Sequence, residues 1–219
     1  MTGEPQNAAE VVTAHYSETD LSAAELDHPA WTSAPPIQIA RKWNGEDAPV
    51  SRHAEARVVW TDESLVVRFV CRQEEPLVVN ATPQVANKTI GLWHRDVCEI
   101  FIAPDARAPE RYFEFEAAPT GEWVDLAIEF KPSGRETDFE FHSGMSTAAT
   151  LLPGQLSIAI RIPWSVSIPK PARGDVWRVN LFRCIGLGDD RYLAWRPTYA
   201  PEPNFHVPQA FGRLHFAQD

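Results

Sequence analysis

Short runs in which apolar and polar residues alternate follow one another along most of the chain. In the clearest run, 155–162, the apolar residues are Leu156, Ile158, Ile160 and Ile162. Successive residues of a β-strand point to opposite sides, so this period of two places the four side chains on one face of a strand. No segment repeats apolar residues at the i, i+3, i+4 and i+7 spacing that predicts an amphipathic helix.

The remaining runs extend this pattern and are separated by Pro, Gly and Asp. They predict strands over 56–60, 65–70, 97–102, 111–117, 122–130, 137–142, 146–152, 176–185, 191–196 and 213–216. The chain has 19 Pro and 11 Gly, which are more breaks than long helices tolerate. The predicted fold class is all-β: a two-sheet antiparallel, jelly-roll-like β-sandwich with short helical turns. We expect a single domain over 20–219, preceded by a polar N-terminal lead-in over 1–19.

Charge and composition exclude several classes of partner. The 219 residues include 20 Lys and Arg against 30 Asp and Glu, a net charge of −10. Nucleic acids and anionic membranes select basic surfaces, so we expect neither as a partner. The sequence has no apolar run of membrane-spanning length and no signal-peptide pattern. We therefore expect a cytoplasmic location by default, or secretion if a leader has been removed.

The first candidate binding residues lie where the run 97–102 begins. Trp93, Asp96 and Glu99 are spaced by three residues. A loop tryptophan followed by a strand carboxylate offers a flat apolar face beside a hydrogen-bond acceptor, which matches the C–H faces and hydroxyls of a sugar. The alternative is structural: Trp93 belongs to the core and Asp96 caps a turn.

A second candidate group lies in the run 111–117. A period of two places Tyr112, Glu114 and Glu116 on one face. If Glu99 lies on a neighbouring strand, the three carboxylates form an acidic patch. Such a patch is typical of a glycosidase acid/base pair or a cation site. The alternative is an exposed or Arg-paired face, which the 16 Arg could supply.

Two polar residues and one aromatic residue complete the candidates. Asn180 and Arg183 interrupt the otherwise apolar run 176–185. Burying either without a partner costs about 1–3 kcal/mol, so they reach a groove or belong to a buried network such as one with Glu99. Phe205 lies in a Pro-rich loop that suits a preorganised rim, where it could face Trp93.

These segments carry a family resemblance. The stretch Trp93-x-x-Asp96-x-x-Glu99-Ile100-Phe101-Ile102 resembles the W-x-x-D-x-V-E-I-F-I element of carbohydrate-binding module family 9. Leu26-Asp27 with Trp31 is similar to the family's opening, 59–67 to its first hairpin, and 205–214 to the tail of a stand-alone branch. The resemblance covers about residues 20–217, nearly the whole chain.

The resemblance implies a β-sandwich that binds sugars in a slot between two aromatic rings, often with structural calcium. By position, Trp93 would be one wall and Phe205 the other, where well-studied members have Trp. Glu99 matches a family residue that hydrogen-bonds the sugar. Glu114 and Glu116 stand where those members have Arg and Asn, which puts the identity of the ligand in question.

Two further points follow from the resemblance. Arg183 lies near a family Gln position and could replace a lost hydrogen-bond donor. Structural calcium could be bound by acidic loops at 62–63 or 189–190, although neither forms a D-x-D-x-D-G loop. A zinc knuckle or disulfide framework is not expected, because Cys71, Cys98 and Cys184 form no C-x-x-C pair.

The leading hypothesis is a non-catalytic carbohydrate-binding domain that holds a mono- or disaccharide and could assist polysaccharide breakdown. The predicted ligand-binding residues are Trp93, Glu99, Glu114, Glu116, Asn180, Arg183 and Phe205. One alternative is a glycoside hydrolase that uses paired Glu residues, and another is a protein-interaction sandwich domain. A haem-binding relative is disfavoured because Met145 is the one internal Met and no C-x-x-C-H motif is present.

Overall fold

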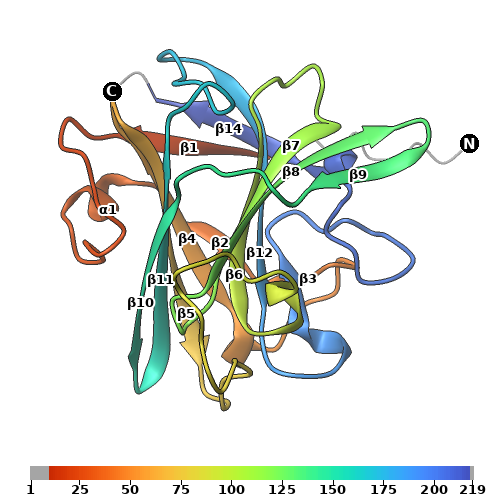
Figure 1. The fold of residues 1–219 in the computed structure, drawn as a ribbon. Helices are drawn as coiled ribbons and strands as arrows, with labels where there is room; N and C mark the ends of the chain where they lie inside the picture. The colour runs from red at the N-terminus through yellow and green to blue at the C-terminus, as the bar shows by residue number, and fades with distance from the viewer. Residues whose placement is uncertain (1–9, 218–219) are drawn as a thin grey trace, which may run out of the picture.

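The computed structural model describes residues 10–217 as two facing β-sheets (Figure 1). The β4–β5 sheet contains β10 (Ser146–Leu152), β11 (Gly154–Pro163), β5 (Ser64–Gln73), β4 (Ala54–Trp60) and β2 (Ile37–Ile39). The β6–β12 sheet contains β14 (Gly212–Phe216), β12 (Val176–Cys184), β6 (Val97–Ala103), β7 (Arg111–Ala117), β8 (Trp123–Lys131) and β9 (Gly134–Asp138), with β13 (Tyr192–Ala194) beside β12 and β3 (Arg41–Lys42) beside β13. The short helix α1 spans Ala30–Ser33. The predicted all-β sandwich in a single domain with short helical turns is confirmed.

Strand β1 (Val11–Tyr16) joins the two sheets. Its first residues pair in parallel with β14 and its last two pair in parallel with β4, and Figure 1 shows it crossing the sandwich beside β14. This strand lies inside the stretch predicted as a lead-in, so that boundary is corrected for 11–16. Its alternation is too short to identify a strand, and the pairing partners come from distant parts of the chain. Residues 1–9 lie outside the described residues.

The main core fills the space between the sheets. The alternating residues Leu156, Ile158, Ile160 and Ile162 are all buried there, as the period of two predicts. They face residues from the inner side of the β6–β12 sheet, among them Ile100. No helix in the described part of the chain is long and apolar enough to cross a membrane.

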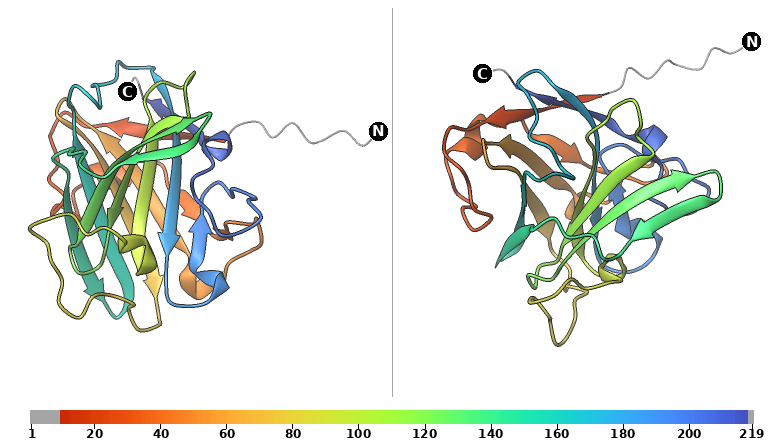
Figure 2. Two further views of the ribbon diagram at one scale, coloured as in Figure 1. Left: turned by 45° about the vertical axis from the view of Figure 1, so that its right-hand side comes forward. Right: turned by 45° about the horizontal axis from the view of Figure 1, so that its top comes forward.

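The outer face of the β6–β12 sheet carries a second apolar cluster. It includes Phe101 on β6, Tyr112 on β7 and Phe182 on β12, together with Phe205 and Phe211 from the segment before β14. Figures 1 and 2 show the β8–β9 hairpin and this C-terminal segment on the same side of the sheet. Because both faces are covered, every residue of β6 is buried.

The β8–β9 hairpin begins earlier than the alternation predicts. Strand β9 spans Gly134–Asp138 rather than 137–142. Lys131 pairs with Gly134, which has φ 123°, so a tight turn returns the chain directly into β9. This register places Arg135 opposite Phe130. The turn geometry therefore decides which residues the hairpin presents over the second cluster.

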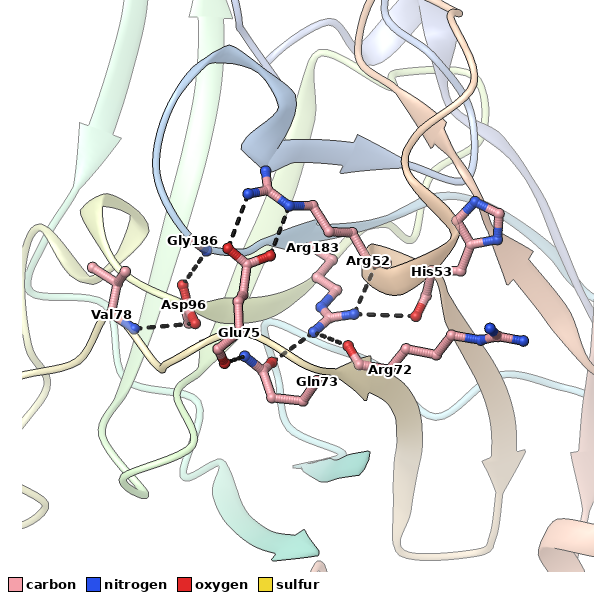
Figure 3. A network of polar contacts seen from close by, with 9 residues as sticks. All are labelled: Arg52, His53, Arg72, Gln73, Glu75, Val78, Asp96, Arg183 and Gly186. Carbon is pink, nitrogen blue, oxygen red and sulfur yellow. Dashed lines mark hydrogen bonds and ion pairs between the residues drawn. The ribbon is translucent and has the colours of Figure 1, made fainter. Parts of the chain in front are cut away.

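Arg183 connects the two sheets at one end of the core (Figure 3). Its guanidinium donates to the backbone carbonyls of Arg52, His53 and Arg72 and to Oε1 of Gln73, at 2.8–3.1 Å. The side chain is 2% exposed. Arg183 thus holds the end of β5 and the segment before β4 against β12.

Replacing Arg183 by Met should lower the free energy of unfolding by about 2–4 kcal/mol, because the acceptors lose a buried charged donor. Urea denaturation measures the change. The matched control is Arg107→Met, since the Arg107 side chain is 93% exposed and its loss should cost less than about 0.5 kcal/mol. Equal midpoints for the two variants would show that the Arg183 network does not stabilise the fold.

Candidate functional site

A cavity of about 340 Å³ lies over the outer face of the β6–β12 sheet. Strands β6 and β7 contribute side chains to it, the β8–β9 hairpin covers one side, and the loop before β14 covers another. Its lining residues are Trp93, His94, Glu99, Phe101, Glu114, Glu116, Leu126, Arg135, Thr137, Phe139, Cys184, Tyr192, Pro203, Asn204, Phe205 and His206. Five of the seven predicted ligand-binding residues therefore line one cavity: Trp93, Glu99, Glu114, Glu116 and Phe205.

Glu99, Glu114 and Glu116 form a carboxyl cluster in this cavity. Glu99 on β6 lies directly opposite Glu116 on β7, and Glu114 is two residues away on the same face. One carboxylate oxygen from each residue lies within 4.8 Å of the others. The three residues are 1%, 2% and 0% exposed, respectively. The alternative of a solvated face is therefore excluded by the structure.

The surroundings of the carboxyl cluster disfavour the ionised form of all three groups. Burial, together with repulsion from the neighbouring carboxyl groups, raises the pKa of Glu99 and Glu116 well above the usual range. Burial also raises the pKa of Glu114. Both oxygens of Glu116 and Oε2 of Glu114 have no hydrogen-bond partner. Within residues 10–217, no lysine or arginine forms an ion pair with any of the three groups.

The groups around the cluster are mostly neutral. His206 Nδ1 lies 2.8 Å from the Tyr112 hydroxyl and 3.9 Å from Glu114 Oε2. Burial lowers the pKa of His206 to about 3, so its imidazole is neutral at physiological pH. The Cys184 thiol donates to Glu99 Oε1 at 3.4 Å. Arg135 lines the cavity from the exposed β9 strand, and its charge acts to lower the pKa of Glu114.

Trp93 and Phe205 supply the aromatic surface. Trp93 is half-buried in a single 3₁₀ turn, Leu92–His94, which directly follows Gly91 with φ 86°. Phe205 stacks on Phe182 with 4.0 Å between ring centroids and 12° between ring planes. One face of Phe205 is therefore held by the sheet while the residue lines the cavity, which makes it a rigid wall.

Asn180 and Arg183 do not line the cavity, so the prediction that they contact a ligand is corrected. Asn180 is fully buried, and its amide bonds the backbone of Arg196 through both oxygen and nitrogen. This pair fastens the start of the loop that carries Phe205. Arg183 points into the opposite, inner face and makes the network of Figure 3 instead of one with Glu99. Consecutive residues of a strand point to opposite faces of the sheet, so Phe182 lies on the outer face and Arg183 on the inner face.

The acidic loops considered for calcium have partners within the protein. Asp62 pairs with Lys170, and Asp190 pairs with Lys42, each at 2.8 Å. Asp96, the middle residue of the Trp93 motif, accepts from the backbone N–H groups of Val78 and Gly186. Asp96 therefore has the structural role that was given as the alternative to ligand binding. Among residues 10–217, the carboxyl cluster is the one group whose ligand atoms converge.

Comparison with known proteins identifies the family. The sequence model of the family described as "Carbohydrate family 9 binding domain-like" matches residues 24–218. The chain belongs to this family. Among curated proteins, none matches the chain by sequence.

Solved structures share the fold of this family 9-like domain. A putative carbohydrate-binding protein from Bacteroides uniformis ATCC 8492 is 17% identical, with a TM-score of 0.75, over 95% of this chain and 99% of its own. A family 9 carbohydrate-binding module from Caldicellulosiruptor kristjanssonii in complex with glucose is 16% identical, with a TM-score of 0.63, over 96% and 97%. A structure of a family 9 module from the same organism in complex with cellotriose is 16% identical, with a TM-score of 0.67. The match covers 96% of this chain and 95% of that one.

Several cavity residues of the family 9-like domain were not among the sequence predictions. Arg135 was missed because the strand was expected to start at residue 137, and the Pro132-Ser133-Gly134 turn signal points to the earlier start. Tyr192 lines the cavity from β13 and contacts the Phe205 ring edge-on at 6.0 Å. Its place is set by tertiary packing, and no local pattern identifies it.

Replacing Glu116 by Gln should change how stability depends on pH. The folded chain keeps a proton on Glu116 that the unfolded chain releases above the ordinary pKa of 4.5. The stability due to this proton is lost as pH rises, by up to about 1.4 kcal/mol per pH unit. Wild type should therefore lose stability relative to the variant between about pH 5 and 8.

Urea denaturation across this range in metal-free buffer measures the difference. Comparing the two proteins cancels the groups that titrate independently of Glu116, so the difference reports Glu116 together with the carboxyl groups that interact with it. Glu140→Gln, at an exposed position, is the control and should follow the wild-type profile. Parallel profiles for Glu116→Gln and wild type would contradict the raised pKa.

Proposed function

We propose that this chain is a non-catalytic carbohydrate-binding domain that holds a mono- or disaccharide in the cavity. The observation that carries the proposal is that Trp93 and Phe205 line one cavity together with three carboxyl groups. Aromatic surfaces beside a few convergent polar groups suit a ligand with C–H faces and a rim of hydroxyls. The volume of about 340 Å³ suits a ligand of one or two sugar rings.

The polar side of the proposed site differs from the sequence prediction. Arg183 makes no contribution, so the ligand meets Glu99, Glu114 and Glu116 with Arg135 at the rim. A protonated carboxyl group donates one hydrogen bond and accepts others, so the cluster can pair with hydroxyls in both directions.

Binding without catalysis is favoured by where the acidic groups lie. Glycoside hydrolysis needs an acid and a second carboxylate on either side of the scissile bond. Here all three carboxyl groups stand on one face of adjacent strands. Support also comes from two solved structures of a family 9 module from Caldicellulosiruptor kristjanssonii, one in complex with glucose and one with cellotriose.

Replacing Trp93 by Ala should weaken sugar binding at least about tenfold, because an aromatic wall is worth about 1–3 kcal/mol. Isothermal titration calorimetry with glucose, cellobiose and a panel of other mono- and disaccharides measures it. Tyr199→Ala is the control, since Tyr199 is exposed and lies outside the cavity. If wild type binds no sugar of the panel, or if both variants bind as wild type does, this site is not the sugar site.

The purified domain should release no detectable product from aryl glycosides or oligosaccharides. The physical reason is the placement of the carboxyl groups on a single face. Product release is followed by absorbance and chromatography. Turnover that disappears in both Glu99→Gln and Glu116→Gln, while Glu140→Gln retains it, would establish the hydrolase alternative instead.

A further inference from the structure

The carboxyl cluster has more acceptor capacity than the protein itself uses. Three oxygen atoms, Oε2 of Glu114 and both of Glu116, are buried without a hydrogen-bond partner. Buried polar atoms of this kind are rare in folded proteins and cost about 1–3 kcal/mol each. Glu116 is 0% exposed, so its two oxygens lie away from the protein surface.

The protein offers little positive charge to the cluster. The nearest basic side chain in an ion-pair contact is His206, 3.9 Å from Glu114 Oε2, and it is neutral at physiological pH. The Cys184 thiol occupies one oxygen of Glu99. One oxygen of each carboxyl group, from β6 or β7, lies within 4.8 Å of the others.

We propose that Glu99, Glu114 and Glu116 form a binding site for an oxygen-preferring divalent cation, with Ca²⁺ as the best match. Ca²⁺ takes carboxylate oxygens at about 2.3–2.6 Å, so oxygens that ring one ion lie up to about 5 Å apart. The spacing of the cluster falls within that range. Three carboxylates, some of them bidentate, supply much of the six- to eightfold coordination that Ca²⁺ requires.

A divalent ion suits the cluster better than the ammonium group of an amino sugar. A single positive charge leaves two carboxyl groups to be neutralised by protons, whereas Ca²⁺ leaves one. The unpartnered oxygens also have almost no accessible surface, so a small ion reaches them more easily than a sugar ring does. Mg²⁺ is less suitable, because it requires near-ideal octahedral geometry at about 2.0–2.1 Å, whereas Ca²⁺ accepts irregular arrangements of carboxylate oxygens.

The ion would lie at the wall of the cavity that Trp93 and Phe205 also line. Its open coordination positions would face the cavity, where sugar hydroxyls could complete the shell. This second step rests on the proposed function, whereas the cation site does not.

Titration of CaCl₂ into the chelator-treated 219-residue chain, without sugar, tests the site. Wild type should bind one Ca²⁺, and its melting temperature should rise as the ion is added. Glu114→Gln/Glu116→Gln removes two charged ligands with little change of volume and should weaken binding at least about tenfold. The control is Asp189→Asn/Asp190→Asn, an exposed acidic pair outside the cavity, which should bind Ca²⁺ as wild type does.

Circular dichroism establishes whether the double variant is folded, and Glu114→Gln alone replaces it if it is not. The proposal is overturned if wild type neither binds Ca²⁺ nor gains thermal stability. It is also overturned if the cluster variant binds as tightly as wild type, or if glucosamine binds in EDTA in a Glu114-dependent way while Ca²⁺ does not bind.

Sugar titrations in EDTA and in CaCl₂ separate this inference from the proposed function. Ca²⁺ binding that depends on the cluster, without any sugar binding, supports the cation site and contradicts the carbohydrate proposal. Sugar binding in EDTA, without any Ca²⁺ binding, supports the carbohydrate proposal and contradicts the cation site.

Discussion

Strand β6 is covered on both faces, and the rest of the structure depends on which of its side chains are buried on each face. Its inner residues, such as Ile100, join the main core, while its outer residues, such as Phe101, join the second apolar cluster. Glu99 belongs to the outer set and is 1% exposed. A carboxyl group is thereby placed in a region where its ionised form is disfavoured.

The pairing of β6 with β7 then adds two more buried carboxyl groups beside Glu99. Because Glu99 lies opposite Glu116, and Glu114 follows the same face, one register brings three acids together. A shift of one residue would send Phe113 and Phe115 to this face and the acids into the main core. The segment before β14, fastened by Asn180 and stacked through Phe205 on Phe182, encloses the cluster. The site therefore combines an apolar enclosure with acceptors that the protein leaves unpaired, a combination that functional sites share.

Much of the fold follows from local patterns, and the site follows from them only in part. The alternation in β11 predicts a strand with one buried face, and the apolar runs of β5 and β6 predict buried strands. Strand β1 could not be predicted, since its identity comes from parallel pairing with β14 and β4. Trp93, Glu99 and Phe205 were identified from motif order, and all three line the cavity. Asn180 and Arg183 were polar residues in an apolar strand, a signal that marks buried networks as well as binding sites.

The sequence by itself determined the all-β class, the face on which Glu114 and Glu116 lie, and the family to which the chain belongs. These properties depend on residue type and a period of two, which are local. Only the tertiary structure decided that the acids are buried, that Arg183 bonds backbone carbonyls across the core, and that Arg135 reaches the cavity. Burial and pairing depend on what other segments place nearby, and no alternation of apolar and polar residues contains that information.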